Sequence, residues 1–305
     1  MKITNGVFNM RGAAYFVVCL KKLLLRLVVA LFFRDKGERK FHLKKWTGQV
    51  EKKYLERYLY VLDTQKQQLN TCPKTIWVCW LQGFENAPAI IRACLKSLQK
   101  HCPDFEIIQI TAENIKMYVD IPDYIYKKFE QGKISRTQFS DLLRLALLSQ
   151  HGGYWIDATV FLAKPIENKI LQAEFFAYHC KGTYKNNSWF LKAAADDMII
   201  RNMKNLMFEY WKYENRLLNY FLYHLFFDLM MEKNKILAAQ WDKVPLLYDD
   251  CYELYSNFFM PYDKEKWRKI NEKTTIHKLN HRYLKDNPIE NTFLEALLAD
   301  KLDMA

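Results

Sequence analysis

The sequence predicts an α/β protein whose mostly parallel central sheet is covered by helices. Short apolar runs rich in β-branched and aromatic residues alternate with amphipathic helical patterns, an order typical of parallel sheets. Half of the 305 residues (50%) are hydrophobic, which excludes a disordered chain. The 7 cysteines are scattered and never spaced as CxxC, so they indicate buried thiols of a reduced, cytosolic protein, neither a disulfide scaffold nor a zinc site.

The pattern of apolar residues places each element. The predicted order is a charged helix over 46–70, a strand over 74–80, a helix over 88–100, a strand over 105–110, helical segments over 111–118 and 123–130, a helix over 140–150, and strands over 154–156 and 175–178. Gly152 and Gly153 follow the helix over 140–150, and a glycine just past a helix end supplies the left-handed backbone of a C-cap. Beyond Asp196 the chain is predicted to be mainly helical. No linker divides residues 71–305, so they are predicted to form one domain.

The positive charge is concentrated in an N-terminal arm, residues 1–70. The formal net charge is +12, and residues 1–60 alone hold 14 Lys+Arg against 4 Asp+Glu. The remainder of the chain is therefore close to neutral. A nucleic-acid-binding protein is expected to carry its basic residues across its folded face, so we expect no nucleic-acid partner.

The arm contains an apolar stretch over 12–33 that Lys21, Lys22 and Arg26 interrupt. Its uncharged runs are shorter than the roughly 18 residues of a spanning helix, and it lacks the cleavage site of a secretory signal. At about 100° per residue, these three residues and Arg11 fall within an arc of about 140°. This pattern predicts a helix in the membrane interface with its basic face toward anionic headgroups, and hence a peripheral protein on the inner face of the cell membrane. The alternative is an amphipathic helix packed on the domain or a partner chain.

Three charged residues mark a candidate site. Asp141 and Arg144 lie three positions apart on the predicted helix, so they share a face. Such a pair alone indicates only a solvated ion pair, but this helix leads through the double glycine into a strand that ends at Asp157. Because ligands of open α/β sheets bind beyond the carboxyl ends of the strands, we expect the site there.

The segments FSDLLR (139–144) and GGYWID (152–157) together resemble the SDxxR…GGxYxDxD block of DxD-type sugar transferases. That family includes Golgi mannosyltransferases and glucosylating bacterial toxins. Its capsular polysaccharide synthesis branch is the most similar, through KTIW (74–77) and GYWIDAT (153–159). The resemblance covers roughly residues 70–285 and leaves the arm outside.

The resemblance implies a GT-A fold and transfer, with retention, of a sugar from a nucleotide-sugar donor such as a UDP-sugar. The implied acceptor is a growing, lipid-linked capsular or exopolysaccharide oligosaccharide. Carried over to this sequence, Trp77 packs on the nucleotide base, with a plain core aromatic as the alternative. Asp141 and Arg144 hold the sugar hydroxyls and phosphates of the donor, and Asp157 contacts the ribose and a metal ion.

The sequence departs from the family pattern at Thr159, which replaces the second aspartate of DxD. Oxygen ligands favour Mn²⁺ or Mg²⁺, and a threonine hydroxyl is a neutral, weaker ligand. His277 is the candidate that compensates, because related folds supply a late-chain histidine to the metal. His281 is a weaker candidate, and His224 is expected either in the core or behind the residues that contact the ligand.

Two alternatives to this activity stay open. Because the second aspartate of DxD is missing, one alternative is a non-catalytic carbohydrate-binding or scaffolding subunit. The other is a transferase whose acceptor is soluble or is a protein. A dehydrogenase is excluded because no GxGxxG follows the first strand.

Overall fold

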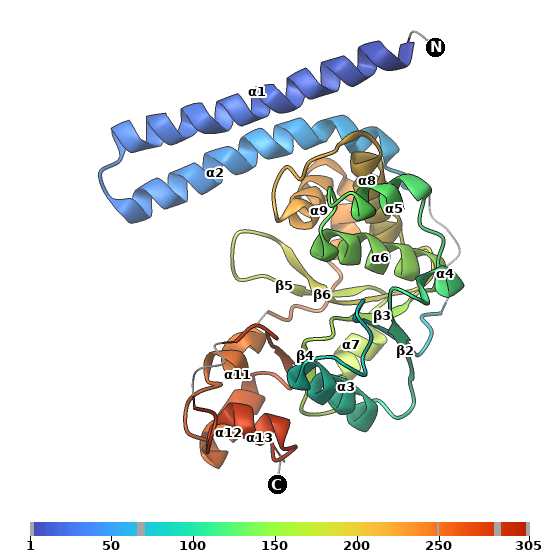
Figure 1. The fold of residues 1–305 in the computed structure, drawn as a ribbon, viewed down its shortest axis with the longest axis vertical. Coiled ribbons are helices and arrows are strands. Elements are labelled where there is room, and N and C mark those ends of the chain that lie inside the picture. The colour runs from blue at the N-terminus through green and yellow to red at the C-terminus, as the bar shows by residue number, and fades with distance from the viewer. Residues whose placement is uncertain (1–2, 66–70, 249, 284–287, 303–305) are drawn as a thin grey trace.

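The computed structural model describes residues 3–65, 71–248, 250–283 and 288–302, with side chains from residue 13 onward. A five-stranded sheet in the order β2-β1-β3-β6-β5 lies at the centre (Figure 1). Its strands are β1 (Thr75–Cys79), β2 (Glu106–Ile110), β3 (Gly153–Ile156), β5 (Phe176–His179) and β6 (Asn186–Ala193). β2, β1 and β3 are parallel, whereas β6 and β5 are antiparallel to their neighbours. The α/β class is confirmed, with a sheet that is parallel only in one half.

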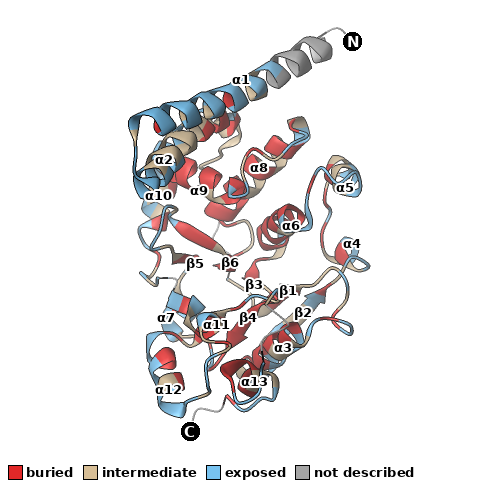
Figure 2. Cartoon of the chain, turned by 60° about the vertical axis from the view of Figure 1, so that its left-hand side comes forward, coloured by how far each residue is buried: buried red, intermediate tan, exposed pale blue. Residues whose placement is uncertain are grey.

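Helices cover both faces of this sheet (Figures 1 and 2). On one face lies α6 (Arg136–His151), backed by α8 (Met198–Tyr213) and α9 (Leu222–Lys233), and on the other lies α3 (Ala89–His101). The remaining helices are α4 (Ile115–Tyr118), α5 (Asp123–Glu130), α7 (Asn168–Gln172), α10 (Lys235–Trp241), α11 (Glu253–Ser256), α12 (Lys264–Lys273) and α13 (Phe293–Leu298), with a 3₁₀ turn at Asp250–Tyr252. α6 is buried along most of its length, because it lies between the sheet and α8.

A second, two-stranded sheet joins the centre of the fold to its C-terminal part. β4 (Val160–Leu162) pairs antiparallel with β7 (Ile276–Lys278), and Val160 lies opposite Lys278. The pairing continues one residue further, where the Leu279 amide donates to the Thr159 carbonyl at 2.8 Å. β7 is thereby held against the turn that follows β3.

Most predicted elements are present. The strands expected over 74–80, 105–110, 154–156 and 175–178 are β1, β2, β3 and β5, and α6 begins four residues earlier than expected because Ser135 caps it. β6 was missed since its first residues are polar, and β4 and β7, of 3 residues each, are too short to show a period. The helix expected over 46–70 begins earlier, at Lys36, and ends at Leu55, with a 3₁₀ segment over Glu56–Val61 after it. Residues 66–70 lie outside the described part of the chain.

The N-terminal arm is an antiparallel helical hairpin that extends from the body (Figure 1). It consists of α1 (Ile3–Phe32) and α2 (Lys36–Leu55), followed by a 3₁₀ segment, Glu56–Val61. The end of α2 and this segment hold the hairpin to the body, because the hydroxyls of Tyr54 and Tyr58 both donate to the buried Glu214 carboxylate.

The charges of α1 are placed differently from the prediction. Lys22 forms an ion pair with the buried Glu51 of α2, so part of the basic arc faces α2. The expectation that this arc faces outward is therefore wrong for Lys22. The outer surface of α1 is instead exposed (Figure 2). Its exposed side chains include a set of large apolar residues between Phe16 and Phe32. Within the described residues, no helix is long and apolar enough to cross a membrane.

Candidate active site

A cleft of about 470 Å³ lies at the carboxyl ends of β1 and β3. Its wall is formed by residues 79–82 after β1, the first half of α6, residues 157–159 after β3, the segment 278–282 after β7, and the rings of Tyr220, Tyr252 and Tyr255. Of the residues predicted for the site, Arg144, Asp157 and Thr159 line this cleft. Trp77, Asp141 and His277 do not.

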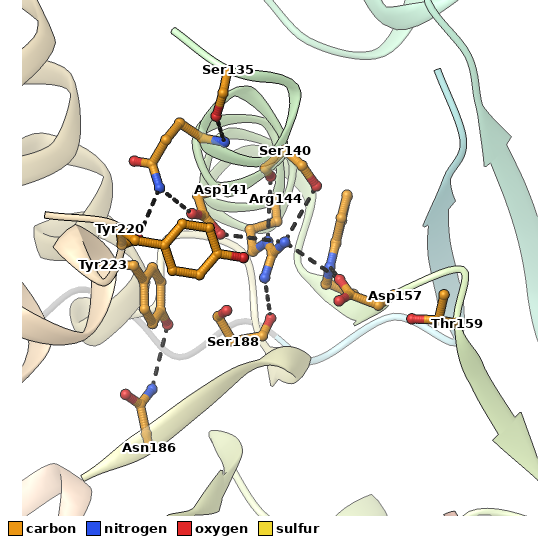
Figure 3. A network of polar contacts seen from close by, with 12 residues as sticks. Ser135, Ser140, Asp141, Arg144, Asp157, Thr159, Asn186, Ser188, Tyr220 and Tyr223 are labelled. Carbon is orange, nitrogen blue, oxygen red and sulfur yellow. Dashed lines mark hydrogen bonds and ion pairs between the residues drawn. The ribbon is translucent and has the colours of Figure 1, made fainter. Parts of the chain in front are cut away.

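Arg144 is the centre of a polar network at the floor of the cleft (Figure 3). Its Nη2 lies 3.3 Å from Asp141 Oδ1 and 3.4 Å from Asp157 Oδ1, and its Nη1 donates to the Ser188 carbonyl at 2.6 Å. The guanidinium also lies 5.0 Å from the ring centroid of Trp155. Helix α6 and the end of β3 thus bring together the three charged residues that the sequence singled out, with the arginine 4% exposed.

Asp141 lies behind Arg144, away from the wall of the cleft. It is buried, and Gln138 Nε2 donates to its Oδ2 at 3.3 Å. Burial raises its pKa to about 6, although Arg144 opposes the shift. Because its charge is directed at Arg144, Asp141 orients the guanidinium. Direct contact with the sugar hydroxyls of a donor, as the resemblance implies, is not supported by this position.

Asp157 is held by cations on both of its oxygens. Arg144 Nη2 lies 3.4 Å from Oδ1, and Lys278 Nζ lies 2.9 Å from Oδ2. The neutral Trp155 Nε1 also donates to Oδ1 at 2.8 Å. Burial alone would raise the pKa of this carboxyl, but Lys278 and Arg144 hold the pKa below its ordinary value. Asp157 is therefore ionised at neutral pH.

Lys278 is a cleft residue that sequence analysis missed. Its ammonium also donates to the Thr159 hydroxyl, so it bridges the two residues at the positions of the DxD motif. The pairing of β7 with β4 places it there, across 119 residues of sequence. No local pattern could have revealed it, since three residues of strand carry no period.

Trp77 is wrongly predicted as the residue that packs on the base. It is 3% exposed, its Nε1 donates to the Gly152 carbonyl at 2.8 Å, and it packs against Tyr118 and His151. A strand alternates its side chains between two faces, and Trp77 in the middle of β1 points into the core. Trp80, just past the end of β1, lines the cleft instead.

Trp80 was missed as a candidate, although the sequence places it as the last residue of the first predicted strand. Its amide donates to the Ile110 carbonyl at 3.0 Å, and Gly83, with φ +85°, closes a turn onto the Trp80 carbonyl at 2.9 Å. The indole meets the ring of His281 edge-on, with centroids 5.1 Å apart. The two rings offer a surface on which a planar base can stack.

The structure contradicts His277 as a metal ligand. His277 neighbours Lys278 on β7 and so points to the opposite face, where its Nε2 lies 3.0 Å from Asn271 Oδ1 and its ring packs on Trp267. Burial lowers its pKa to about 3, so the imidazole is neutral. His281 lines the cleft, and His224 is half-buried, with its ring stacked on that of Tyr184.

The residues at the cleft do not fit a bound Mn²⁺ or Mg²⁺. Among the described residues, no three His, Cys, Asp or Glu side chains are grouped as ligands. Asp157 has both oxygens engaged by other donors, Thr159 is neutral, and an ammonium stands between them. A divalent cation there would be repelled by Lys278 and would find a single carboxylate, Asp157, among the described lining residues.

Two known glycosyltransferases are similar to parts of this chain. The O-glycosyltransferase braB of Annulohypoxylon truncatum is 30% identical over 107 residues, which make up 32% of this chain and 25% of that protein. The match therefore spans about a quarter of that relative's length. The structure of the PaToxG glycosyltransferase is similar with a TM-score of 0.40 and 15% identity, over 73% of this chain and 85% of that chain. This likeness is too weak to support statements about the site.

A family match covers far more of the chain. Residues 30–297 match the family of capsular polysaccharide synthesis proteins, a range wider than the 70–285 expected from the motifs. It takes in α2, the central sheet and every segment of the cleft wall. The protein therefore belongs to the capsular polysaccharide synthesis protein family.

Proposed function

We propose that this protein is a glycosyltransferase that moves a sugar from a nucleotide-sugar donor, a UDP-sugar, to a growing capsular or exopolysaccharide oligosaccharide. The charge of the cleft carries the proposal. Its described lining residues include four cations, Arg136, Arg144, Lys278 and Arg282, and a single carboxylate, Asp157. A surplus of arginine and lysine in a concave site suits the diphosphate of such a donor, and the family to which the chain belongs supports it.

The aromatic side chains of the cleft fit the other parts of such a donor and of its acceptor. Trp80 at the end of β1 meets His281 after β7 and offers a place where a base can stack, and Tyr220, Tyr252 and Tyr255 also line the wall. Tyr220 is 64% exposed, so its ring is free to pack on a sugar. Charge and aromatic rings in one cleft favour a sugar–nucleotide over a purely apolar ligand.

We further propose that transfer proceeds with retention at the anomeric carbon and without a nucleophile from the protein. Asp157 is the single carboxylate among the described lining residues, and both its oxygens are engaged. Cys79 also lines the cleft, but burial raises its pKa to about 12, so it is a thiol at neutral pH. The departing diphosphate is then the group that guides the acceptor hydroxyl to the same face of the sugar.

The test is donor binding followed by transfer. We expect one member of a panel of nucleotide sugars to raise the melting temperature of the protein selectively, because a ligand that binds only the native state stabilises it. With that donor and an oligosaccharide acceptor, the wild type should release nucleoside diphosphate, and Asp157→Asn should lose this activity while remaining folded. A donor that binds without any transfer would favour the scaffolding alternative. Equal activity in Asp157→Asn would contradict the site.

The acceptor is proposed to be lipid-linked, because the hairpin offers a surface for a membrane. α1 rests on α2 through buried side chains such as Val18 and Val29. Its outer side carries a row of exposed apolar residues, Phe16, Leu20, Leu23, Leu24, Leu27, Leu31 and Phe32, of which Leu31 is 81% exposed. Such an exposed apolar row, with the exposed cations Lys21 and Arg26 on the same helix, is typical of interfacial helices.

The charge around this row favours an anionic lipid surface as its occupant. Lys21 and Arg26 are exposed on α1, and more exposed cations follow at the hairpin bend and along α2. Residues 13–50 hold nine Lys and Arg against two Asp and Glu. Basic residues near a membrane surface are attracted to anionic headgroups. We therefore propose a peripheral protein on the cytoplasmic face of the cell membrane, held there by the hairpin.

Vesicle binding tests this placement. Full-length protein should co-sediment with anionic phosphatidylglycerol vesicles and much less with neutral phosphatidylcholine vesicles. The triple variant Leu24→Glu, Leu27→Glu, Leu31→Glu should bind more than about tenfold more weakly, because it removes apolar area that the bilayer would bury and adds charges that anionic headgroups repel.

The matched control places the same three charges on exposed apolar residues elsewhere, Met117→Glu, Ile236→Glu and Leu246→Glu. It should bind vesicles as the wild type does. Unchanged binding of the α1 variant would contradict the membrane proposal. If the wild type formed a dimer without lipid and the α1 variant were monomeric, a second copy of the chain would be the partner that covers the apolar row of α1.

A further inference from the structure

Lys278 occupies the place in the cleft where the family resemblance would put a metal ion. Its Nζ is 2.9 Å from Asp157 Oδ2 and donates to the Thr159 hydroxyl, and its side chain is 16% exposed toward the cleft. An ammonium has three N–H donors, and these contacts use two of them. The third is left for a ligand in the cleft.

The strands hold this ammonium in place. Lys278 lies opposite Val160 in the β4–β7 pair, and the amide that follows it, of Leu279, donates to the Thr159 carbonyl at 2.8 Å. Backbone bonds on both sides of the residue therefore fix the start of its side chain, and Asp157 and Thr159 fix the end. A donor group held in this way needs little reorganisation when charge develops beside it.

The charge of Lys278 also equals the net charge that is lost when Thr159 replaces the second aspartate of DxD and its metal ion. An aspartate with a divalent cation brings a net charge of +1, and a threonine with an ammonium brings the same +1. The cluster Asp141, Arg144, Asp157 and Lys278 is formally neutral, so it tolerates the dianionic diphosphate better than a pair of aspartates without metal would. The charge lost by the exchange of a carboxylate for Thr159 is thus compensated within the cleft by Lys278, on strand β7, which pairs with β4.

Resting on the proposed function, we propose that Lys278, together with Arg144, stabilises the departing diphosphate of the donor, so that the enzyme transfers sugar without a divalent metal ion. The bond between the anomeric carbon and the phosphate oxygen breaks, and its electron pair stays on the diphosphate. Lys278 Nζ–H donates to an oxygen of that diphosphate, and Arg144 supplies the second positive charge. The acceptor hydroxyl oxygen forms the new bond to the anomeric carbon, and its proton passes to the departing diphosphate.

Nucleotide binding by the full chain tests this role without relying on turnover. Isothermal titration calorimetry with UDP, GDP and dTDP should find one that binds in the presence of EDTA. Addition of Mn²⁺ should change its dissociation constant by no more than about twofold. Nucleotide binding that requires Mn²⁺ would overturn the role of Lys278 and leave the proposed function standing. Failure of all three to bind under both conditions would overturn the proposed function and this inference with it.

Variants assign the effect to the ammonium. In EDTA, Lys278→Met should weaken binding of the nucleotide at least about tenfold, because a charge-assisted bond to phosphate is lost, and Lys278→Arg should restore part of it. Lys264→Met, an exposed lysine at the start of α12 outside the cleft, should bind as the wild type does. Equal affinity of Lys278→Met and wild type would overturn the inference, provided that both melt at the same temperature.

A converse experiment rebuilds the metal site. The double variant Thr159→Asp, Lys278→Ser presents two carboxylates and no ammonium, so it should bind the nucleotide only when Mn²⁺ is added. This gain of metal dependence is expected only if the ammonium and a metal ion serve the same purpose. Metal-independent binding by this variant would count against the inference.

Discussion

Arg144→Ala is expected to destabilise the fold by about 3–5 kcal/mol, the cost of removing one partner from a buried ion network. Asp141 and Asp157 would be left without the cation that lies 3.3 and 3.4 Å from them, and Asp141 is buried. Sugar transfer should fall by about 10²–10³-fold, because a preorganised donor to the leaving group disappears. Chemical denaturation and the rate of nucleoside diphosphate release measure the two effects.

A surface arginine with the same number of carboxylate partners serves as a control that separates the effect of burial on stability from the effect of losing a positive charge. Arg268 also has two carboxylate partners, Glu265 and Glu272, but its side chain is 57% exposed. Arg268→Ala should therefore change stability by less than about 1 kcal/mol and leave transfer unaffected. Asp141→Asn combined with Arg144→Ala should recover part of the lost stability, because it removes one of the two unpaired charges. Equal losses in Arg144→Ala and Arg268→Ala would contradict the buried network.

Gly152→Ala is expected to cost about 3 kcal/mol or more, because it combines backbone strain with a clash. Gly152 ends α6 with φ +70° and ψ −159°, a region that is almost restricted to glycine. A Cβ there would lie 2.5 Å from the Ala195 amide nitrogen and 2.9 Å from the Ala193 carbonyl oxygen. Both contacts are to backbone next to β6, so no side chain can rotate away. The midpoint of denaturant unfolding measures the loss.

Gly132 is the control, because its φ is also positive but it has no neighbouring atoms that a Cβ would contact. It has φ +68°, yet a Cβ there would meet nothing within 4 Å. Gly132→Ala should therefore cost about 1 kcal/mol, the strain of a left-handed backbone alone. If Gly152→Ala were no worse than Gly132→Ala, the close approach of β6 to the α6–β3 junction would be incorrect. Loss of transfer in Gly152→Ala is expected to follow from misplacement of Asp157, since β3 begins directly after this junction.

The sequence by itself determined the features whose causes are local. Asp141 and Arg144 share a face of α6 because they are three residues apart, and Asp157 follows the end of a short apolar strand. The double glycine predicted the turn between α6 and β3, where Gly152 and Gly153 both have positive φ. These signals were sufficient for the α/β class and for three charged residues of one network.

The remaining assignments depended on which strands pair across the chain. Trp77 and Trp80 are both aromatic residues at the first strand, and only the alternation and length of β1 separate the core residue from the cleft residue. His277 and Lys278 are adjacent in sequence, and the register of β7 on β4 turns one toward Trp267 and the other toward Asp157. A three-residue strand gives no periodic signal, so the tertiary structure alone decided that Lys278, and not its neighbour His277, faces Asp157 in the cleft.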